Sequence, residues 1–209
     1  MGMGMGRGLK LGQRSGSSGA AVPQQMALPA SNSRADGPAN PLSGLASGEL
    51  EVVTTLTAVT GNDHLFGVWR TTAATRAASL FLTSANKLAF WVSNGATVSY
   101  GGQSTAAVTA TAGQLVSFKA SMAANGDITL FENDVVIGST TIAGWTTFSS
   151  ATTPLTVGAA FLGSDANVGA KVHSAVVRDG PGGSALAVFD PANLGGFTLV
   201  NGAAVEPTP

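Results

Sequence analysis

The sequence predicts an all-β protein, folded as a two-sheet antiparallel sandwich or jelly roll. Three observations predict this class. Charged residues make up only 10% of the chain while Gly numbers 28, a composition typical of short strands joined by tight turns. Apolar and polar residues alternate with period 2 in many short segments, as they do in strands with one buried face. Turn residues separate these segments at close spacing, which is the pattern of a sandwich.

Residues 1–47 form a segment of different composition, in which Gly, Pro and Ser are frequent and little can be buried. Such a segment does not offset its own ordering entropy. We therefore expect an extended arm held by a neighbouring chain, with a terminus docked on its own domain as the alternative. The arm carries four bases and one acid, a balance of +3, whereas the remaining residues carry six bases and ten acids, a balance of −4. The residues expected to contact the partner are Arg7, Leu9, Lys10, Leu11, Arg14, Val22, Met26, Leu28 and Arg34.

The sandwich is expected over residues 48–205. Its first strand begins at Glu49 and places Leu50, Val52 and Thr54 on one face, with Glu49 and Glu51 on the other. Alternation and flanking turn residues then predict the strands Leu65–Arg70, Ser79–Thr83, Lys87–Ser93, Thr97–Tyr100 and Ala107–Thr111.

A meander of three strands is predicted within Gly113–Ser139. Its two turns, Asn125-Gly126 and Asn133-Asp134, consist of residues that tolerate a positive φ. The strands of the meander are Val116–Met122, Ile128–Glu132 and Val135–Ile137. A loop or short strand at Trp145–Ser150 is followed by the predicted strands Leu155–Leu162, Lys171–Arg178, Ala185–Phe189 and Phe197–Val200. Residues 206–209 are expected to be a frayed C-terminal tail.

Composition argues against several classes of function. The net charge is −1, whereas nucleic-acid recognition requires clustered Lys and Arg. The chain has no Cys, so it has neither disulfides nor thiolate metal sites. Its longest apolar runs are far shorter than the roughly 18 residues of a membrane span. We expect no nucleic-acid partner and no membrane partner.

The sequence contains no pattern that predicts catalysis. Glu49 and Glu51 are the only carboxylates two residues apart in a predicted strand, and we interpret them as a solvated strand edge rather than as an acid/base pair. His64 and His173 lack a second histidine at ligand spacing and are interpreted as structural. We expect no catalytic residue and no enzymatic activity.

Two ligand sites are considered. Calcium takes six to eight oxygen ligands, and the candidate oxygens lie in two loops where Asn and Asp could instead simply form turns. These candidates are Asn62, Asp63, Asp165 and Asn167. For a glycan, the candidate platform is Trp145, with burial against the edge of the sandwich as the alternative. No cofactor other than calcium is considered.

The order of strand, Asn-Gly turn, "ITLFEND" and "VVIGS" resembles the central hairpins of laminin-G-like, concanavalin A-like domains. The resemblance extends more loosely from about Gly48 to the C-terminus. There, "VHSAVVRDGPGG", "ALAVFDPAN" and "FTLVNG" are similar to the closing strands of such domains in tailed-phage virion proteins. The hydrolytic members of this lectin-glucanase family carry a Glu-x-Asp-x-x-Glu run, which this sequence lacks.

This resemblance implies a non-enzymatic structural protein of a tailed-phage particle, located in the virion and assembled in the host cytoplasm. The expected role is capsid decoration or a comparable accessory position. The arm would bind other virion proteins, either capsid or tail subunits, and a homo-oligomer such as a trimer is expected. The alternative is a carbohydrate-binding adhesin or tail-fibre module that binds a cell-surface glycan. A degenerate glucanase is the third hypothesis.

Overall fold

The computed structural model describes residues 23–30, 32–57, 63–70, 75–95, 98–99, 101–159 and 170–208. These residues form two antiparallel β-sheets that pack against each other, which confirms the predicted all-β sandwich. None of the helical turns in this part of the chain is long and apolar enough to cross a membrane.

The first sheet, sheet A, has the strand order β10-β9-β8-β3-β12-β1-β15, and β13 also pairs with β12. Its strands are β1 (Gln24–Ala27), β3 (Gly48–Thr55), β8 (Leu115–Met122), β9 (Asp127–Glu132), β10 (Val135–Thr141), β12 (Lys171–Arg178), β13 (Ala185–Phe189) and β15 (Ala204–Pro207). Sheet B has the order β14-β2-β11-β4-β5-β6-β7. Its strands are β2 (Arg34–Ala39), β4 (Asp63–Val68), β5 (Ala78–Leu82), β6 (Leu88–Ser93), β7 (Val98–Ser99), β11 (Pro154–Gly158) and β14 (Thr198–Val200).

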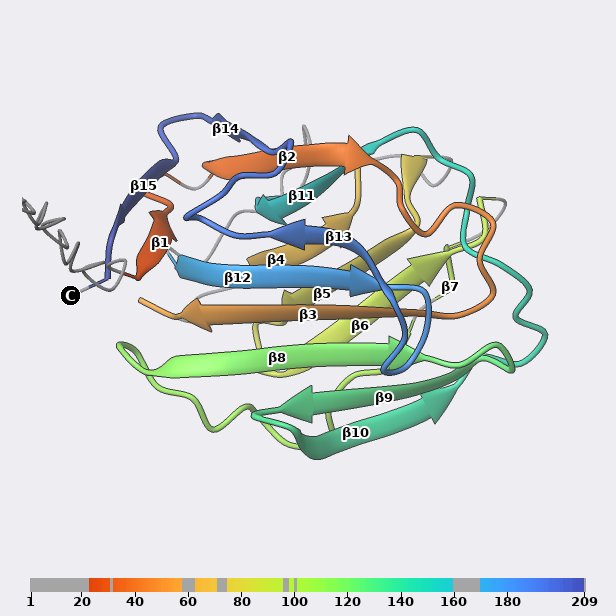
Figure 1. The fold of residues 1–209 in the computed structure, drawn as a ribbon. Coiled ribbons are helices and arrows are strands. Elements are labelled where there is room, and N and C mark those ends of the chain that lie inside the picture. The colour runs from red at the N-terminus through yellow and green to blue at the C-terminus, as the bar shows by residue number, and fades with distance from the viewer. Residues whose placement is uncertain are drawn as a thin grey trace, which may run out of the picture.

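The hydrophobic core lies between the two sheets. Figure 1 shows them as layers, with β3, β8 and β12 in front of β4, β5 and β6. Leu50 and Phe118 enter the core from sheet A, and Phe66, Leu80 and Phe90 enter it from sheet B; all five are fully buried. For the first strand, the alternation in the sequence placed Leu50 on the buried face correctly, because successive side chains of a strand point to opposite sides.

The predicted meander is present as β8, β9 and β10. Asn133 and Asp134 form the second turn with φ of 51° and 62°, the left-handed region that Asn and Asp tolerate better than most residues. At the first turn, Gly126 has φ of 89°. A Cβ at this position would lie 2.4 Å from the carbonyl oxygen of Ile142, so the turn requires Gly.

The structure corrects the predicted boundary between arm and sandwich. The residues expected at an external partner are part of the fold from Pro23 onward: Met26 in β1 and Leu28 are 0% and 4% exposed and belong to the core. Arg34 in β2 is also buried, and its Nε lies 2.6 Å from a carboxylate oxygen of Asp36. These strands were missed because they are short and lie in a Pro-rich context, where alternation over four to six residues is a poor signal.

The C-terminal tail is also paired rather than frayed. β15 runs antiparallel to β1, with Gln24 opposite Pro207 and Ala27 opposite Ala204. Beyond the strand, the N–H of Thr208 donates to the carbonyl of Pro23 at 2.8 Å. The predicted fraying was wrong because the partner strand lies at the other end of the sequence, where local patterns carry no information about it.

The predicted strand Ala107–Thr111 is a loop instead. The carboxylate of Glu132, which is 4% exposed, accepts hydrogen bonds from the N–H groups of Thr109 and Ala110 at 2.7–3.0 Å. A side chain therefore binds donors that a neighbouring strand would otherwise bind. Val108 still packs into the core, which explains the strand-like alternation.

Candidate functional site

The outer face of sheet A carries two aligned rows of side chains that cross five strands. They follow from the register of β12, β3, β8, β9 and β10, in which outward-facing residues lie directly opposite one another. The polar row consists of Arg178, Glu49, Ser121, Thr129 and Ser139. The mixed row consists of Val176, Glu51, Lys119, Phe131 and Val136. Neighbours within a row are about 5 Å apart. Glu49 and Ser121 are buried, so the polar row is accessible to a ligand mainly at Thr129 and Ser139.

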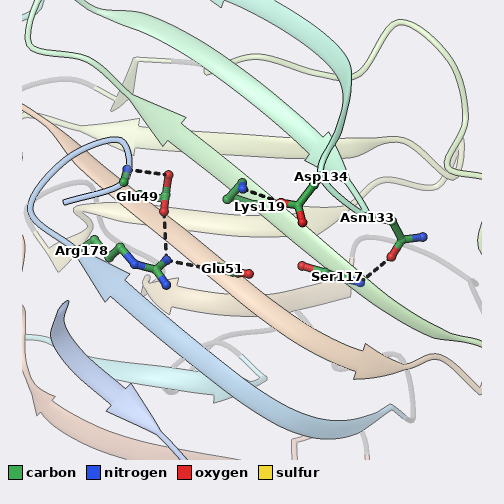
Figure 2. Close-up of polar contacts among 8 residues, drawn as sticks. Glu49, Glu51, Ser117, Lys119, Asn133, Asp134 and Arg178 are labelled. Atoms are coloured by element: carbon green, nitrogen blue, oxygen red, sulfur yellow. Dashed lines mark hydrogen bonds and ion pairs between the residues drawn. The ribbon is translucent and has the colours of Figure 1, made fainter. Parts of the chain in front are cut away.

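Arg178 joins two carboxylates at one end of these rows. Its Nη1 donates to Glu49 at 2.9 Å and to Glu51 at 2.8 Å, as Figure 2 shows. Glu49 is only 6% exposed, and its second oxygen accepts the N–H of Gly182 at 3.3 Å. The interpretation of Glu49 as a solvated edge residue was therefore wrong. Hydrogen bonding to Glu51 and the charges of both carboxylates raise the pKa of Arg178 above its ordinary value.

Lys119 is held in the middle of the mixed row. Its ammonium group lies 2.7 Å from Asp134 and 4.6 Å from the centre of the Phe131 ring, a cation–π distance. The hydrogen bond to Asp134, together with the charges of Asp134, Glu49 and Glu51, raises the pKa of Lys119. Figure 2 shows Lys119 pointing to the β9–β10 turn. There, Asn133 Oδ1 accepts the backbone N–H of Ser117 at 3.0 Å and fixes the turn to β8.

A shallow groove of about 300 Å³ lies over the β9–β10 hairpin. Its lining residues are Asp127, Ile128, Thr129, Ser139, Thr140 and Thr141. Asp127 is fixed by two donors: the Thr141 hydroxyl at 2.5 Å and the Asn125 amide at 2.7 Å. These hydrogen bonds lower the pKa of Asp127, and the one from Thr141 has the larger effect. Since Thr129 and Ser139 also belong to the polar row, the groove is its continuation.

No protein-family model matches the chain, and no curated protein matches it in sequence. Solved structures nevertheless share its fold. A heptameric SAP-like pentraxin from Limulus polyphemus superposes with a TM-score of 0.64 at 11% identity, covering 90% of this chain and 96% of the pentraxin. The mouse laminin α1 chain, domains LG4-5, superposes with a TM-score of 0.58 at 16% identity, and the match covers 85% of this chain and 46% of the laminin chain. The CBM40 of the Ruminococcus gnavus IT-sialidase, bound to α2,3-sialyllactose, superposes with a TM-score of 0.57 at 15% identity. The match covers 75% of this chain and 90% of the CBM40 chain.

The chain shares the concanavalin A-like β-sandwich fold of these structures. This confirms the fold that the sequence resemblance implied, since the laminin and pentraxin domains superpose over most of the chain. At such low identities the similarity concerns the fold alone. The tailed-phage origin stays a prediction.

Trp145 is packed at the edge of the sandwich rather than presented as an open platform. Its indole N–H donates to the carbonyl of Ala46 at 2.8 Å, and its ring meets that of Phe148 edge-to-face at 5.0 Å. A second aromatic group lies on sheet B, where Trp91 is 4.3 Å from Phe81 and 5.7 Å from Trp69. Trp69 is 2% exposed, whereas Trp91 is half-buried. Trp91 is therefore the more accessible tryptophan of this group.

Of the remaining predicted site residues, the structure describes only Asp63. Asp63 is 4% exposed within β4, while the other calcium candidates, Asn62, Asp165 and Asn167, lie outside the described residues. In the described ranges there is no group of three or more His, Asp or Glu side chains suited to a metal ion. The arm residues outside the described part are Arg7, Leu9, Lys10, Leu11, Arg14 and Val22.

His64 is buried between two hydroxyl groups of sheet B. Its Nδ1 lies 2.9 Å from the Ser79 hydroxyl, and its Nε2 lies 3.1 Å from that of Thr156. Because the Thr156 hydroxyl donates to the carbonyl of Gly67, its oxygen accepts the hydrogen bond from the Nε2–H group of His64. Burial lowers the pKa of His64 to about 3. His64 is structural, as the sequence predicted.

Sequence reasoning missed the groove and the polar row. A signal was present, since Asp127, Thr129 and Phe131 alternate with apolar residues and therefore face outward together. Their alignment with Ser121 and Ser139 depends on strand register, and register between strands is a property of the fold.

Proposed function

We propose that this chain is a non-enzymatic carbohydrate-binding module that presents the outer face of sheet A to a glycan. The polar row carries this proposal. At its accessible end, the Thr129 and Ser139 hydroxyls lie side by side on adjacent strands, close to the exposed carboxylate of Asp127, and they match the closely spaced donors and acceptors of sugar hydroxyls. Phe131, in the neighbouring row, adds apolar surface beside them.

The similar structures support this proposal. The R. gnavus CBM40 is described as bound to α2,3-sialyllactose, and a Bacteroides ovatus protein with a TM-score of 0.63 at 8% identity is described as a putative carbohydrate binding protein. This chain covers 60% of the latter. Both use the sandwich architecture found here, although fold alone does not determine function.

The charge cluster supports a binding role rather than hydrolysis. Glycoside hydrolases use two carboxyl groups on either side of the scissile bond, one as acid and one as base or nucleophile. Glu49 and Glu51 instead share one guanidinium group, and Glu49 accepts a backbone N–H as well. Both carboxylates therefore bind the same guanidinium group and do not lie on either side of a bound sugar.

Binding of the full chain to an oligosaccharide array, followed by calorimetry on the best ligand, tests this function. We expect saturable binding, with NMR shift changes confined to β3, β8, β9 and β10. Trp145→Phe serves as a control: it retains the ring packing against Phe148 and is expected to bind as wild type. Failure of every glycan to bind would contradict the proposal, as would shift changes restricted to sheet B.

A second candidate is the virion accessory role implied by the sequence resemblance, with the glycan-binding face displayed on a particle. Two observations favour an assembly role. Residues 1–22 carry three bases and no acid, and sheet A exposes apolar side chains on β10 and β13. These side chains are Val135, Val136, Leu186 and Val188, which are 42–64% exposed. Other virion proteins, and a homo-oligomer of this chain, are the partners that this role requires.

Co-assembly tests the second candidate. The chain lacking residues 1–22 is expected to retain its β-sheet circular dichroism but to lose incorporation into particles, because the basic segment is the proposed anchor. Full occupancy of the truncated chain in purified particles would overturn the anchoring role.

A further inference from the structure

We propose that the groove over the β9–β10 hairpin is the primary sugar subsite and that it accepts neutral saccharides while rejecting acidic ones. This inference rests on the proposed carbohydrate-binding function and assigns both a location and a ligand class to it. The groove volume, about 300 Å³, is at the lower end of the range of small-molecule sites and fits a terminal sugar rather than a long chain.

The groove has unused hydrogen-bonding groups. Within the described structure, the hydroxyls of Thr129 and Ser139 have no protein partner. They lie directly opposite each other on β9 and β10, whereas Ser121, next in the row on β8, is buried. Each hydroxyl can donate one hydrogen bond and accept two, so the pair can bind adjacent hydroxyl groups of one sugar ring.

Asp127 supplies a fixed acceptor at the end of this series. The Thr141 hydroxyl and the Asn125 amide each donate to one of its carboxylate oxygens, and its own N–H donates to Asn125 Oδ1 at 3.1 Å. The carboxylate is therefore held in place before a ligand arrives. An ionised carboxylate has about four lone-pair positions, which leaves acceptor capacity for the O–H groups of a sugar.

The charge distribution selects against acidic sugars. Every base within the described strands of sheet A is ion-paired: Lys119 with Asp134, Lys171 with Glu206, and Arg178 with Glu49 and Glu51. Recognition of a sugar carboxylate or sulfate requires an available cation, with Arg the preferred residue. Near the groove, an acidic ligand would instead meet the charge of Asp127. This differs from the ligand of the R. gnavus CBM40 structure, which carries sialic acid.

The competing surface is the aromatic group on sheet B, where Trp91 is the more accessible ring. Among the described residues of this surface, the Ser79 hydroxyl opposite Trp91 already binds His64 and is not available to a sugar. The two surfaces are on opposite sides of the sandwich, so substitutions distinguish them cleanly.

The test uses the full chain and a panel that pairs each neutral oligosaccharide with its sialylated or sulfated derivative, for example lactose with α2,3-sialyllactose. The neutral members are expected to bind and the acidic members to lose affinity. In calorimetry with the best neutral member, Thr129→Val and Asp127→Ala are expected to weaken binding at least about tenfold each. Thr198→Val, an exposed threonine in β14 of the opposite sheet, is the matched control and is expected to leave affinity unchanged.

The remaining outcomes distinguish the ligand class, the location of the site and the carbohydrate-binding function. Preferential binding of the acidic members would overturn the ligand class and leave the carbohydrate-binding function intact. Wild-type affinity in the two groove variants, with loss of binding in Trp91→Ala, would move the site to sheet B. Absence of binding to every member of the panel would contradict the proposed function itself, and the groove assignment with it. Circular dichroism of each variant confirms folding, which is expected because both substituted side chains line the open groove.

Discussion

Deletion of residues 1–47 is expected to abolish folding, whereas deletion of residues 1–22 is expected to leave the sandwich folded. The longer deletion removes β1 and β2, and with them Met26, Leu28 and Leu42, all no more than 4% exposed. Truncating one such side chain to Ala typically costs about 2–5 kcal/mol. The three together therefore approach or exceed the roughly 5–15 kcal/mol of stability of a typical domain.

Backbone pairing adds to this loss. β2 lies between β14 and β11 in sheet B, and β1 lies between β12 and β15 in sheet A, so the deletion leaves neighbouring strands with unsatisfied edges. Circular dichroism and thermal unfolding of the two truncated chains measure the effect. Met26→Ala is the matched point variant, expected to remain folded with about 2–5 kcal/mol less stability. A cooperative transition in the chain lacking residues 1–47 would show that β1 and β2 are dispensable.

Acidification between pH 6.5 and pH 3 is expected to destabilise the protein through His64. The unfolded-state pKa is 6.5 and the folded-state pKa is about 3, so within this window the unfolded chain binds one more proton. Stability therefore falls as the pH falls, by about 1.4 kcal/mol per pH unit. The full contribution of neutral His64 is present above pH 6.5, and about 3 kcal/mol of it is lost by pH 4.

Urea unfolding of wild type and His64→Gln across this range, at constant ionic strength, measures the effect. The variant lacks the titrating group, so it is expected to be less stable than wild type at pH 7 and to lose less stability on acidification. His173→Gln is the control. His173 is half-buried and hydrogen-bonded to Thr55 at 2.9 Å, and burial and the charge of Lys171 lower its pKa. Parallel stability curves for wild type and His64→Gln would show that His64 is not responsible.

Long strands with clear alternation were predictable because their information is local. β8 and β9 appear at the predicted positions, and Gly126, Asn133 and Asp134 in the predicted turns have a positive φ. The short strands β1, β2 and β15 were not found. In four to six residues the period is poorly defined, and what orders β1 and β15 is their pairing with each other and with β12.

The candidate site was less predictable than the fold. The residue types were visible, but Trp145, which the sequence put forward, uses its indole N–H within the protein. The groove residues occur in an ordinary polar alternation that sequence alone does not distinguish from a solvated face. Glu49 illustrates the same limit, since its burial follows from Arg178 and Gly182 rather than from its own neighbours.

The sequence by itself therefore determined the strand periodicity, the buried faces of the long strands, the turn positions and the sandwich class, because each depends on residues within one turn or strand. The tertiary structure alone decided which strands are neighbours and in which register. Glu49 and Arg178 are 129 positions apart in the chain, and Gln25 and Glu206 are 181 apart. Their contacts arise from packing of the whole core, and the polar row and groove depend on the same long-range alignment.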